Sequence, residues 1–564
     1  MELIYKELKK SGRGMYLYYP SEENRTAFKR CSITVLRDNN DEASVRQLLE
    51  EGGMAELARR EQAILAFPNP EGGRWNYDFG EGPDDVAAYV DFQDAMSKPD
   101  DEPLERRPDG IPTYQAMIST WHPMMDTRYL IGIGDGAKMA LTLAACAPEQ
   151  VTAVLSLDGV LCEEARQRAV DAVMPVCLLG SDKRTENYFN VANETASVPQ
   201  EGQWDVWRNQ ANPLQCVMTG KSQAFTSELL EDVWARLFSK VRRTNTGAHG
   251  DCEPRMDFAA AGFEIYLDDD RLEEEVKTPH TWFVHVPESV KRGDKKVPLM
   301  MFYHGGSDNP AEAAEMSKFH ELGEKEGFIT VYPWGTNKTQ WNSVMDPQEP
   351  DDVGFAVALI RYMLKYYPVD SERVYLSGFS NGAAHAQVVA MLYPELIAAI
   401  CHIDSNWPGL RGKPCEVDYQ EVTPMRLALE KKKEYDYRMP VWYTYGTREM
   451  SYPVYQKCSQ QHQYDFWKPY NNIEALPTPP QEEPDHCGCG VPGQVQERLR
   501  PSARHPHHFY DVQRFYTRDE NHWNLYNYVM MHDKGHDVAQ MDPTLGWEYV
   551  KQFRRLPDGS LGIL

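Results

Sequence analysis

The sequence is short of positive charge and of long apolar runs. Its 59 lysines and arginines are outnumbered by 85 aspartates and glutamates, which gives a formal net charge of -26. That balance argues against nucleic acid or an anionic membrane as the main partner. No stretch approaches the roughly 18 uninterrupted apolar residues of a membrane-spanning helix, and the first twenty residues lack an apolar signal-peptide core. We therefore expect a soluble, cytoplasmic protein.

Closely spaced cysteines are also scarce. The 11 cysteines are an odd number scattered over 564 residues, which favours reduced thiols over a disulfide framework. One cluster, HCGCG at His486 to Gly490, lacks the ligand number and spacing of a metal site. We expect a loop there, and neither a metal nor a cofactor. The length predicts two or three globular domains, each with its own core.

A serine between two glycines is the first feature that indicates chemistry. In RVYLSGFSNGAAHAQ, Arg373 to Gln387, the residues before Ser380 read as a short buried strand and those after it as a helix. Strand, tight turn and helix are the context that the G-x-S-x-G nucleophile motif of an α/β-hydrolase requires. Ser380 is therefore the predicted nucleophile, and the amide of Asn381, at a helix N-terminus, can stabilise an oxyanion.

The chain repeats itself. YLIGIGDGAKMALTLAACAPE, Tyr129 to Glu149, aligns without a gap on YLSGFSNGAAHAQVVAMLYPE, Tyr375 to Glu395. Matching segments lie upstream and downstream of these in the same order. They include a final segment in each half that starts with Trp and ends in two arginines, WARLFSKVRR (Trp234 to Arg243) and WEYVKQFRR (Trp547 to Arg555). We infer two tandem α/β-hydrolase-like domains, 1–258 and 259–564, each a mostly parallel sheet flanked by helices.

The two copies differ where chemistry is expected. At the position of Ser380 the first copy has Gly134, and RDN replaces the HGG at His304 to Gly306. The first copy also lacks a histidine before its last helix, since His249 follows that helix and is better placed in a linker. We therefore predict that the first domain is catalytically degenerate.

A serine nucleophile needs a general base and an acid that orients it. His536 lies between a predicted strand and the last helix, where this fold carries its base. Glu449, three residues beyond the strand that ends at Gly446, is the predicted acid. Asp404 and Asp533 are alternatives, although Asp404 has a counterpart in the inactive copy, Asp158, which favours a structural role.

The pocket needs a second oxyanion donor and a surface for substrate. The donor is predicted from Gly305 and Gly306, whose backbone freedom can turn an amide toward the serine. Predicted substrate contacts are His304, Trp334, Trp341 and Trp407. The alternative for the tryptophans is a core or loop role, which the matching Trp75 of the first copy favours for Trp341.

With these residues assembled, the second copy resembles the poly(3-hydroxybutyrate) depolymerase and feruloyl esterase group of α/β-hydrolases. The resemblance is carried by HGGSDN, by DDVGF leading through VDSERVYLSGFSNG, by YGTREMSYP and by the Gly535-His536 pair, over residues 262–564. It implies a Ser, acid, His triad and hydrolysis of carboxylic esters, from hydroxyalkanoate polymers or from acetyl and feruloyl groups on plant polysaccharides.

Three features depart from that family. Glu449 stands where the family pattern has Asp, no export signal is evident, and residues 455–510 form a Pro- and His-rich insertion that fits a lid or a loop. Without export, soluble oligomers or small esters suit the protein better than a solid polymer. The predicted partner is a small-molecule or oligosaccharide ester, with no nucleic acid and no membrane.

Two other functions remain open. An acyl-aminopeptidase-like serine peptidase uses the same triad, although no β-propeller repeat precedes the second domain. A non-catalytic binding protein is the alternative from another class, and the retention of serine, histidine and a glycine-rich loop in one copy argues against it. We expect the two domains to pack as an intramolecular pseudo-dimer; a homo-oligomer is compatible with the sequence.

Overall fold

In the computed structural model the chain forms two compact units, Met1–Met256 and Asp257–Leu564. The boundary expected from the sequence lies near residue 258. It describes residues 3–8, 12–20, 31–96, 126–200, 202–244, 249–338, 340–405, 408–409, 421–448, 463–474, 493–500, 509–532 and 534–564. None of the helices in these ranges combines the length and apolar composition that a bilayer crossing requires.

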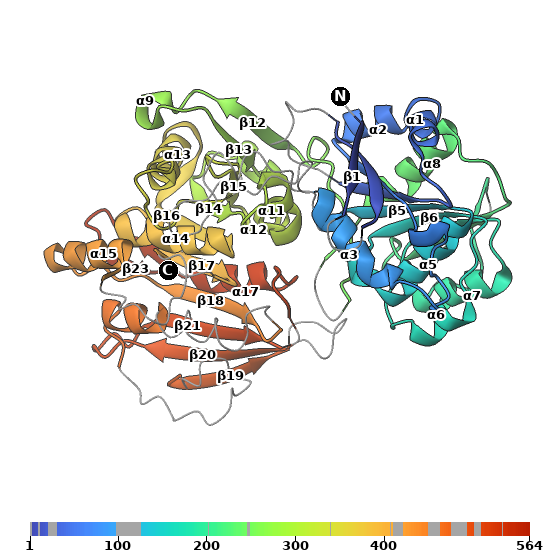
Figure 1. The fold of residues 1–564 in the computed structure, drawn as a ribbon. Coiled ribbons are helices and arrows are strands. Elements are labelled where there is room, and N and C mark those ends of the chain that lie inside the picture. The colour runs from blue at the N-terminus through green and yellow to red at the C-terminus, as the bar shows by residue number, and fades with distance from the viewer. Residues whose placement is uncertain are drawn as a thin grey trace. The chain divides into compact units, whose positions relative to one another are not determined.

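Each unit is built on one large sheet (Figure 1). In the first unit the spatial order is β1 (Leu3–Glu7), β2 (Gly14–Tyr18), β4 (Ile64–Pro68), β3 (Ser32–Leu36), β5 (Arg128–Ile133), β6 (Ala153–Leu157), β7 (Val176–Leu179), β9 (Cys216–Gly220) and β8 (Asp205–Arg208). In the second unit it is β12 (Phe263–Asp269), β13 (His280–His285), β15 (Ile329–Pro333), β14 (Val297–Tyr303), β16 (Val369–Phe379), β17 (Ala399–Ile403), β18 (Val441–Gly446), β21 (Asn524–Met531), β20 (Tyr510–Tyr516) and β19 (Val495–Leu499).

Helices follow most of the parallel strands, as crossover connections require. The first unit has α1 (Glu42–Glu50), α2 (Met54–Glu61), α3 (Asp85–Met96), α5 (Asp135–Cys146), α6 (Glu163–Arg168), α7 (Lys183–Ala192) and α8 (Ser227–Arg236). The second has α9 (Glu273–Val276), α10 (Glu288–Lys291), α11 (Pro310–Ser317), α12 (Phe319–Glu326), α13 (Asp352–Tyr366), α14 (Asn381–Leu392), α15 (Thr423–Glu434) and α17 (Asp542–Val550). A small hairpin lies near the end of each unit, made of β10 (Val241–Arg243) and β11 (Cys252–Pro254), or of β22 (Phe553–Arg555) and β23 (Leu561–Ile563).

The central strands are apolar on both sides because helices cover both faces of each sheet. Along β3 and β4 of the first unit, alternate residues enter two separate core clusters, with Ile33 and Leu65 in one and Leu36 and Ile64 in the other. Both units are α/β domains in which parallel strands form the centre of the sheet and antiparallel strands lie at its edges. The predicted fold class is confirmed in these features.

The strand registers of the two units coincide at aligned positions. Tyr129 of β5 pairs with Ala153, and Tyr375 of β16 pairs with Ala399, so both pairs are separated by the same number of residues. Both tyrosine hydroxyls donate to a carbonyl in the terminal hairpin, Val241 O at 2.8 Å and Phe553 O at 2.7 Å. Aligned residues therefore occupy the same place in each fold.

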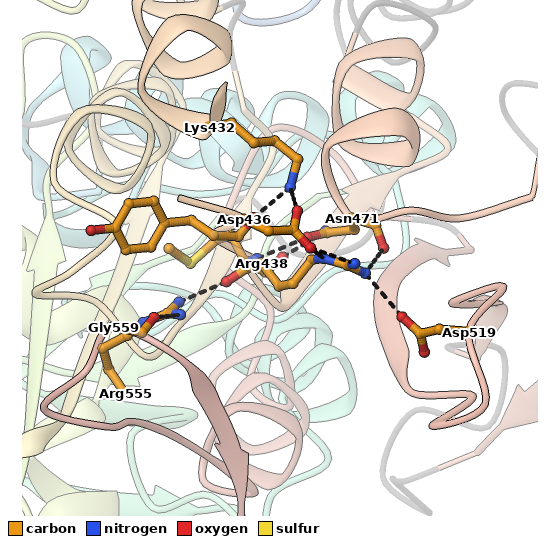
Figure 2. Close-up of polar contacts among 9 residues, drawn as sticks. Lys432, Asp436, Arg438, Asn471, Asp519, Arg555 and Gly559 are labelled. Atoms are coloured by element: carbon orange, nitrogen blue, oxygen red, sulfur yellow. Dashed lines mark hydrogen bonds and ion pairs between the residues drawn. The ribbon is translucent and has the colours of Figure 1, made fainter. Parts of the chain in front are cut away.

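A buried arginine ties the end of each unit to its sheet. In the second unit Arg555 donates from Nε to Ile397 O (3.0 Å), from Nη2 to Arg438 O (2.6 Å) and from Nη1 to Gly559 O (3.0 Å). Figure 2 shows this arginine beside a network in which Arg438 bonds Asp436 and Asp519. The network lies before β18, at the end of the strand opposite to the predicted site.

The first unit makes the same connection with Arg243. Its guanidinium donates from Nε to Val151 O (2.7 Å), from Nη2 to Val173 O (2.5 Å) and from Nη1 to His249 O (2.8 Å). Val151 and Val173 align with the residues whose carbonyls Arg555 binds. His249, which the sequence places in a linker after the last helix, thus contributes its carbonyl to this anchor.

A geometry shared by both units also appears inside the segment predicted as an insertion, 455–510. Asn471 accepts from Met439 N (2.8 Å) and donates to Met439 O (2.7 Å), as Asn193 does with Met174 at 2.9 and 2.7 Å. The helix before Asn471, over residues 463–470, carries the fully buried Phe466 and Trp467. This part of the segment therefore belongs to the core. The HCGCG stretch lies outside the described residues.

Candidate active site

Ser380 occupies a strained turn between β16 and α14. Its backbone has φ 54° and ψ −116°, a region that a side chain with a Cβ rarely adopts. The residue is 7% exposed, and its amide donates to Ile403 O at 3.0 Å. This conformation, at a strand-to-helix junction, has the geometry described for the nucleophile elbow of α/β-hydrolases.

The two glycines of the motif are required by close backbone approaches. A Cβ on Gly378 would lie 2.5 Å from Gly382 O, and one on Gly382 would collide with the carbonyl oxygens of Tyr303 and His304. The helix that carries Ser380 therefore packs directly on the end of β14. This packing brings the predicted oxyanion loop, residues 304–306, beside the elbow.

Within that loop the amides of Gly305 and Gly306 differ in their surroundings. The amide of Gly305 donates to Asp308 Oδ2 at 3.0 Å, and Gly305 is buried, whereas Gly306 is exposed. The amide of Asn381 lies in the first turn of α14, where backbone N–H groups have no partner within the helix. Among the described residues, the predicted donor Gly305 N is bonded to Asp308, and Gly306 N and Asn381 N stay the predicted oxyanion donors.

The side chain of His304 fixes the orientation of this loop through hydrogen bonds. It is fully buried, its Nε2 accepts from Gly335 N at 3.0 Å, and its Nδ1 lies 2.6 Å from Gly305 O. Burial lowers the pKa of His304 to about 4, so the neutral ring carries its proton on Nδ1 and donates it to Gly305 O. Since C=O and N–H point in opposite directions across a trans peptide, this bond turns the Gly306 N–H away from His304.

Asn381 holds a second loop against the elbow. Its Oδ1 accepts from Trp341 N at 2.6 Å, and its Nδ2 lies 3.4 Å from Ser343 Oγ. Trp341 is fully buried and donates from Nε1 to His304 O at 2.9 Å. Its indole therefore supports the oxyanion loop and has no face open to a substrate.

The other predicted substrate contacts are Trp334, His304 and Trp407. Trp334 is only 4% exposed, so its ring is also closed to solvent. His304 is fully buried and contacts the backbone oxygen of Gly305. Trp407 lies outside the described residues. Trp334 and Trp341, predicted to stack on substrate, are therefore both buried in the loop between β15 and α13.

His536 lies next to the elbow. Its ring packs on Phe379, the residue before Ser380, with ring centroids 4.7 Å apart. The segment that carries it runs beside the end of β18, where Arg448 N donates to Lys534 O at 2.8 Å and Thr447 N to Met531 O at 3.1 Å. The predicted acid, Glu449, follows Arg448 directly; Glu449 and Asp533 lie outside the described residues.

Asp404, the other candidate acid, is fully buried at the end of β17. Its Oδ2 lies 2.8 Å from Lys534 Nζ and accepts from Asp537 N at 3.3 Å. Asp404 therefore binds residues on both sides of His536. Sequence reasoning missed Lys534, because one lysine in a short polar loop gives no signal of burial.

The equivalent place in the first unit has the same backbone turn with glycine in place of serine. Gly134 adopts φ 65° and ψ −128°, close to the angles of Ser380. Asp38, aligned with Gly305, accepts from Asp135 N at 2.7 Å, and that amide is the counterpart of Asn381 N. The Asp38 carboxylate thus binds the amide that corresponds to a predicted oxyanion donor of the second unit, and Trp75 donates to Arg37 O at 2.7 Å as Trp341 does to His304 O. Within the described residues of either unit, no group of three or more His, Cys, Asp and Glu side chains is arranged to hold a metal ion.

Comparison with known proteins gives matches in the second unit. Residues 285–406 match the family model described as Esterase PHB depolymerase. A bifunctional acetylxylan esterase/xylanase of Neocallimastix patriciarum is 37% identical over 86 residues, 15% of this chain and 12% of its own. An acetylxylan esterase of Coprinopsis cinerea is 24% identical over 35% of this chain and 56% of its own. A poly(3-hydroxyalkanoate) depolymerase of Paucimonas lemoignei is 30% identical over 22% of this chain and 30% of its own.

The matched family segment contains the oxyanion loop, Ser380 and Asn381, and it ends before His536. The chain spans between about an eighth and just over half of the length of these relatives. The resemblance predicted from the sequence is confirmed: the second unit is similar to the PHB depolymerase esterases and to acetylxylan and feruloyl esterases.

Proposed function

We propose that the second unit is a serine esterase that hydrolyses carboxylic esters. The observation that carries the proposal is the strained conformation of Ser380, held between β16 and α14, with the start of α14 packed on the carbonyls of Tyr303 and His304. Strain of this kind costs about 1–3 kcal/mol and persists at functional sites. The similarity to esterases of residues 285–406 supports the same reaction class.

The proposed reaction passes through an acyl-enzyme. His536 takes the proton of Ser380 as Oγ bonds to the ester carbonyl carbon, and the amides of Gly306 and Asn381 stabilise the negative charge on the carbonyl oxygen. The C–O bond to the alcohol then breaks, and His536 returns the proton to the leaving oxygen. Water, activated by His536, releases the acid and restores the serine. Glu449 is proposed to orient the imidazole and stabilise its charged form.

The proposed substrates are soluble short-chain, hydroxyalkanoate-type, acetyl or feruloyl esters. Relatives named for acetylxylan, feruloyl and poly(3-hydroxyalkanoate) esters support this range. A cytoplasmic location stays a prediction, as does the pseudo-dimer of the two units.

The test compares hydrolysis of p-nitrophenyl acetate, p-nitrophenyl butyrate and methyl ferulate by the wild type and by Ser380→Ala. We expect the variant to lose at least about 10⁴-fold in kcat, and the order of the three esters to identify the acyl group. Equal hydrolysis by both proteins would show that Ser380 is not the nucleophile. Gly134→Ser in the Ser380→Ala background is the matched control, and it should stay inactive.

We propose further that the first unit is a catalytically degenerate copy of the second. The equal strand registers, the equivalent arginine anchors and the shared elbow angles support it. Gly134 removes the nucleophile, and Asp38 fills the oxyanion position with a charge that would repel the oxyanion. A function in binding or support then replaces catalysis in this unit.

A further inference from the structure

We propose that a buried pair, Asp404 and Lys534, is a positioning device for His536. The inference rests on the proposed function and adds two residues to its site. Asp404 follows β17, and Lys534 lies two residues before His536 in the loop after β21. Their side chains are 0% exposed and 2.8 Å apart.

The contacts reach the loop on both sides of the histidine. Asp404 Oδ2 binds Lys534 Nζ, two residues before His536, and accepts from Asp537 N, one residue after it. Fixing both flanks of a four-residue segment restricts the position of the residue between them. A misplacement of about 1 Å in a catalytic group lowers rates by about 10²-fold, so such support has a direct effect on catalysis.

The cluster continues away from the site. Lys534 Nζ also lies 3.1 Å from Asp542 Oδ2, and Asp542 accepts from Tyr510 Oη at 3.0 Å and from Ala539 N at 2.9 Å. Two buried carboxylates therefore face one ammonium group. The described titratable groups that contact the His536 loop include Asp404, Asp542 and Tyr510, from β17, α17 and β20, and Lys534 and Asp537 of the loop itself. Arg448, just after β18, donates its backbone N–H to Lys534 O.

Stability is a poor explanation for this arrangement. Burying charges loses hydration that their mutual attraction often does not recover, and apolar replacements are frequently as stable. The first unit does without the cluster: Asp158, the counterpart of Asp404, is exposed, and so is Lys221 after β9. The buried charges occur in the unit that retains the serine and the histidine, which is expected if they serve the histidine.

The test uses Asp404→Asn in the full chain, with Asp542→Asn as matched control. Asparagine keeps the size, tolerates the positive φ of 47°, and leaves Lys534 paired one-to-one with Asp542. The control removes the same charge from the far side of Lys534 and keeps the bond from Asp537 N. Rates are normalised to the serine that reacts with a fluorophosphonate, so partial unfolding does not lower them.

For Asp404→Asn we expect at least a tenfold loss of kcat with little change in KM. Hydrogen exchange of residues 534–538 should become faster. Asp542→Asn should change kcat less than threefold.

Two results would overturn the proposal: rates and hydrogen exchange equal to wild type in Asp404→Asn, or the same losses in both variants. If the wild type hydrolyses no ester, the proposed function fails, and hydrogen exchange alone decides whether Asp404 holds the loop. Unchanged exchange would then reject the clamp independently of activity.

Discussion

The two units share the turn at Gly134 and Ser380 but differ in its residue. Gly134 and Ser380 have nearly the same backbone angles, yet glycine adopts them freely and serine does so against its steric preference. Beside them, an aspartate accepts from the following amide in the first unit, and a glycine loop takes the place of that aspartate in the second. The backbone turn is therefore independent of the serine, and the strained residue lies in the unit that we propose to be catalytic.

Ser380→Gly converts the second elbow into the first and should give the largest effect. We expect loss of at least about 10⁴-fold in ester hydrolysis. At the same time the unfolding free energy should rise by about 1 kcal/mol, because the strained φ is relieved and part of the gain is lost to the freer unfolded glycine. Kinetics and urea denaturation measure the two effects. Ser380→Ala, which keeps the strain, is the control, and a destabilised Ser380→Gly would contradict this account.

Acid should lower the unfolding free energy of the second unit more than that of the first. Burial lowers the pKa of His304 to about 4 and of His385 and His402 to about 3, and it lowers that of His280, His285 and His320 as well. All six belong to the second unit; the first has only His122 and His249 in its sequence.

The sign follows from proton binding. Below about pH 6.5 the unfolded histidines bind protons that the folded ones refuse, so the unfolding free energy of the second unit falls as pH drops toward 4. The loss is about 2 kcal/mol at pH 5 for each fully buried histidine. Asp352, whose pKa burial raises to about 6, partly offsets it. Hydrogen exchange of the full chain at pH 7 and pH 5 should show opening in 257–564 first; equal opening of both units would contradict this.

The arginine anchors should give matched, intermediate effects. Arg555→Met leaves three carbonyls of the second unit without their donor, and Arg243→Met does the same in the first. Each substitution should lower the unfolding free energy of its own unit by about 3 kcal/mol. Urea denaturation followed by hydrogen exchange assigns each loss to a unit. A loss of unfolding free energy in only one of the two variants would contradict the equivalence of the anchors. Ester hydrolysis at 25 °C should be unchanged in Arg243→Met.

Asp38→Ala should give the smallest effect. The substitution removes one exposed carboxylate that accepts from Asp135 N, so we expect the first unit to lose about 1 kcal/mol. Activity should stay at the wild-type level. Urea denaturation followed by hydrogen exchange measures the change in the first unit. Asp41→Ala, which removes the N-cap of α1, is the control and should lower the unfolding free energy by a similar amount. A fall in ester hydrolysis would instead assign the first unit a part in the reaction.

Local patterns in the sequence are sufficient to predict the repeat, the position of Ser380 and the loops that surround it. A glycine-bounded turn, apolar strands and small-residue helices are readable within about twenty residues. Alignment of the two halves extends these signals, since it places Gly134 opposite Ser380 and Trp75 opposite Trp341.

Which groups are engaged and which remain available depends instead on the tertiary fold. The Nδ1 proton of His304, the engaged amide of Gly305, the burial of Trp334 and Trp341, and the Asp404–Lys534 contact all depend on neighbours from other strands and loops. Asp404 and Lys534 are 130 residues apart in the chain, and neither carries a local mark of burial. Hydrogen bonds and charge pairs of this kind form where separate strands end at the same edge of a sheet, and sequence spacing does not encode that proximity.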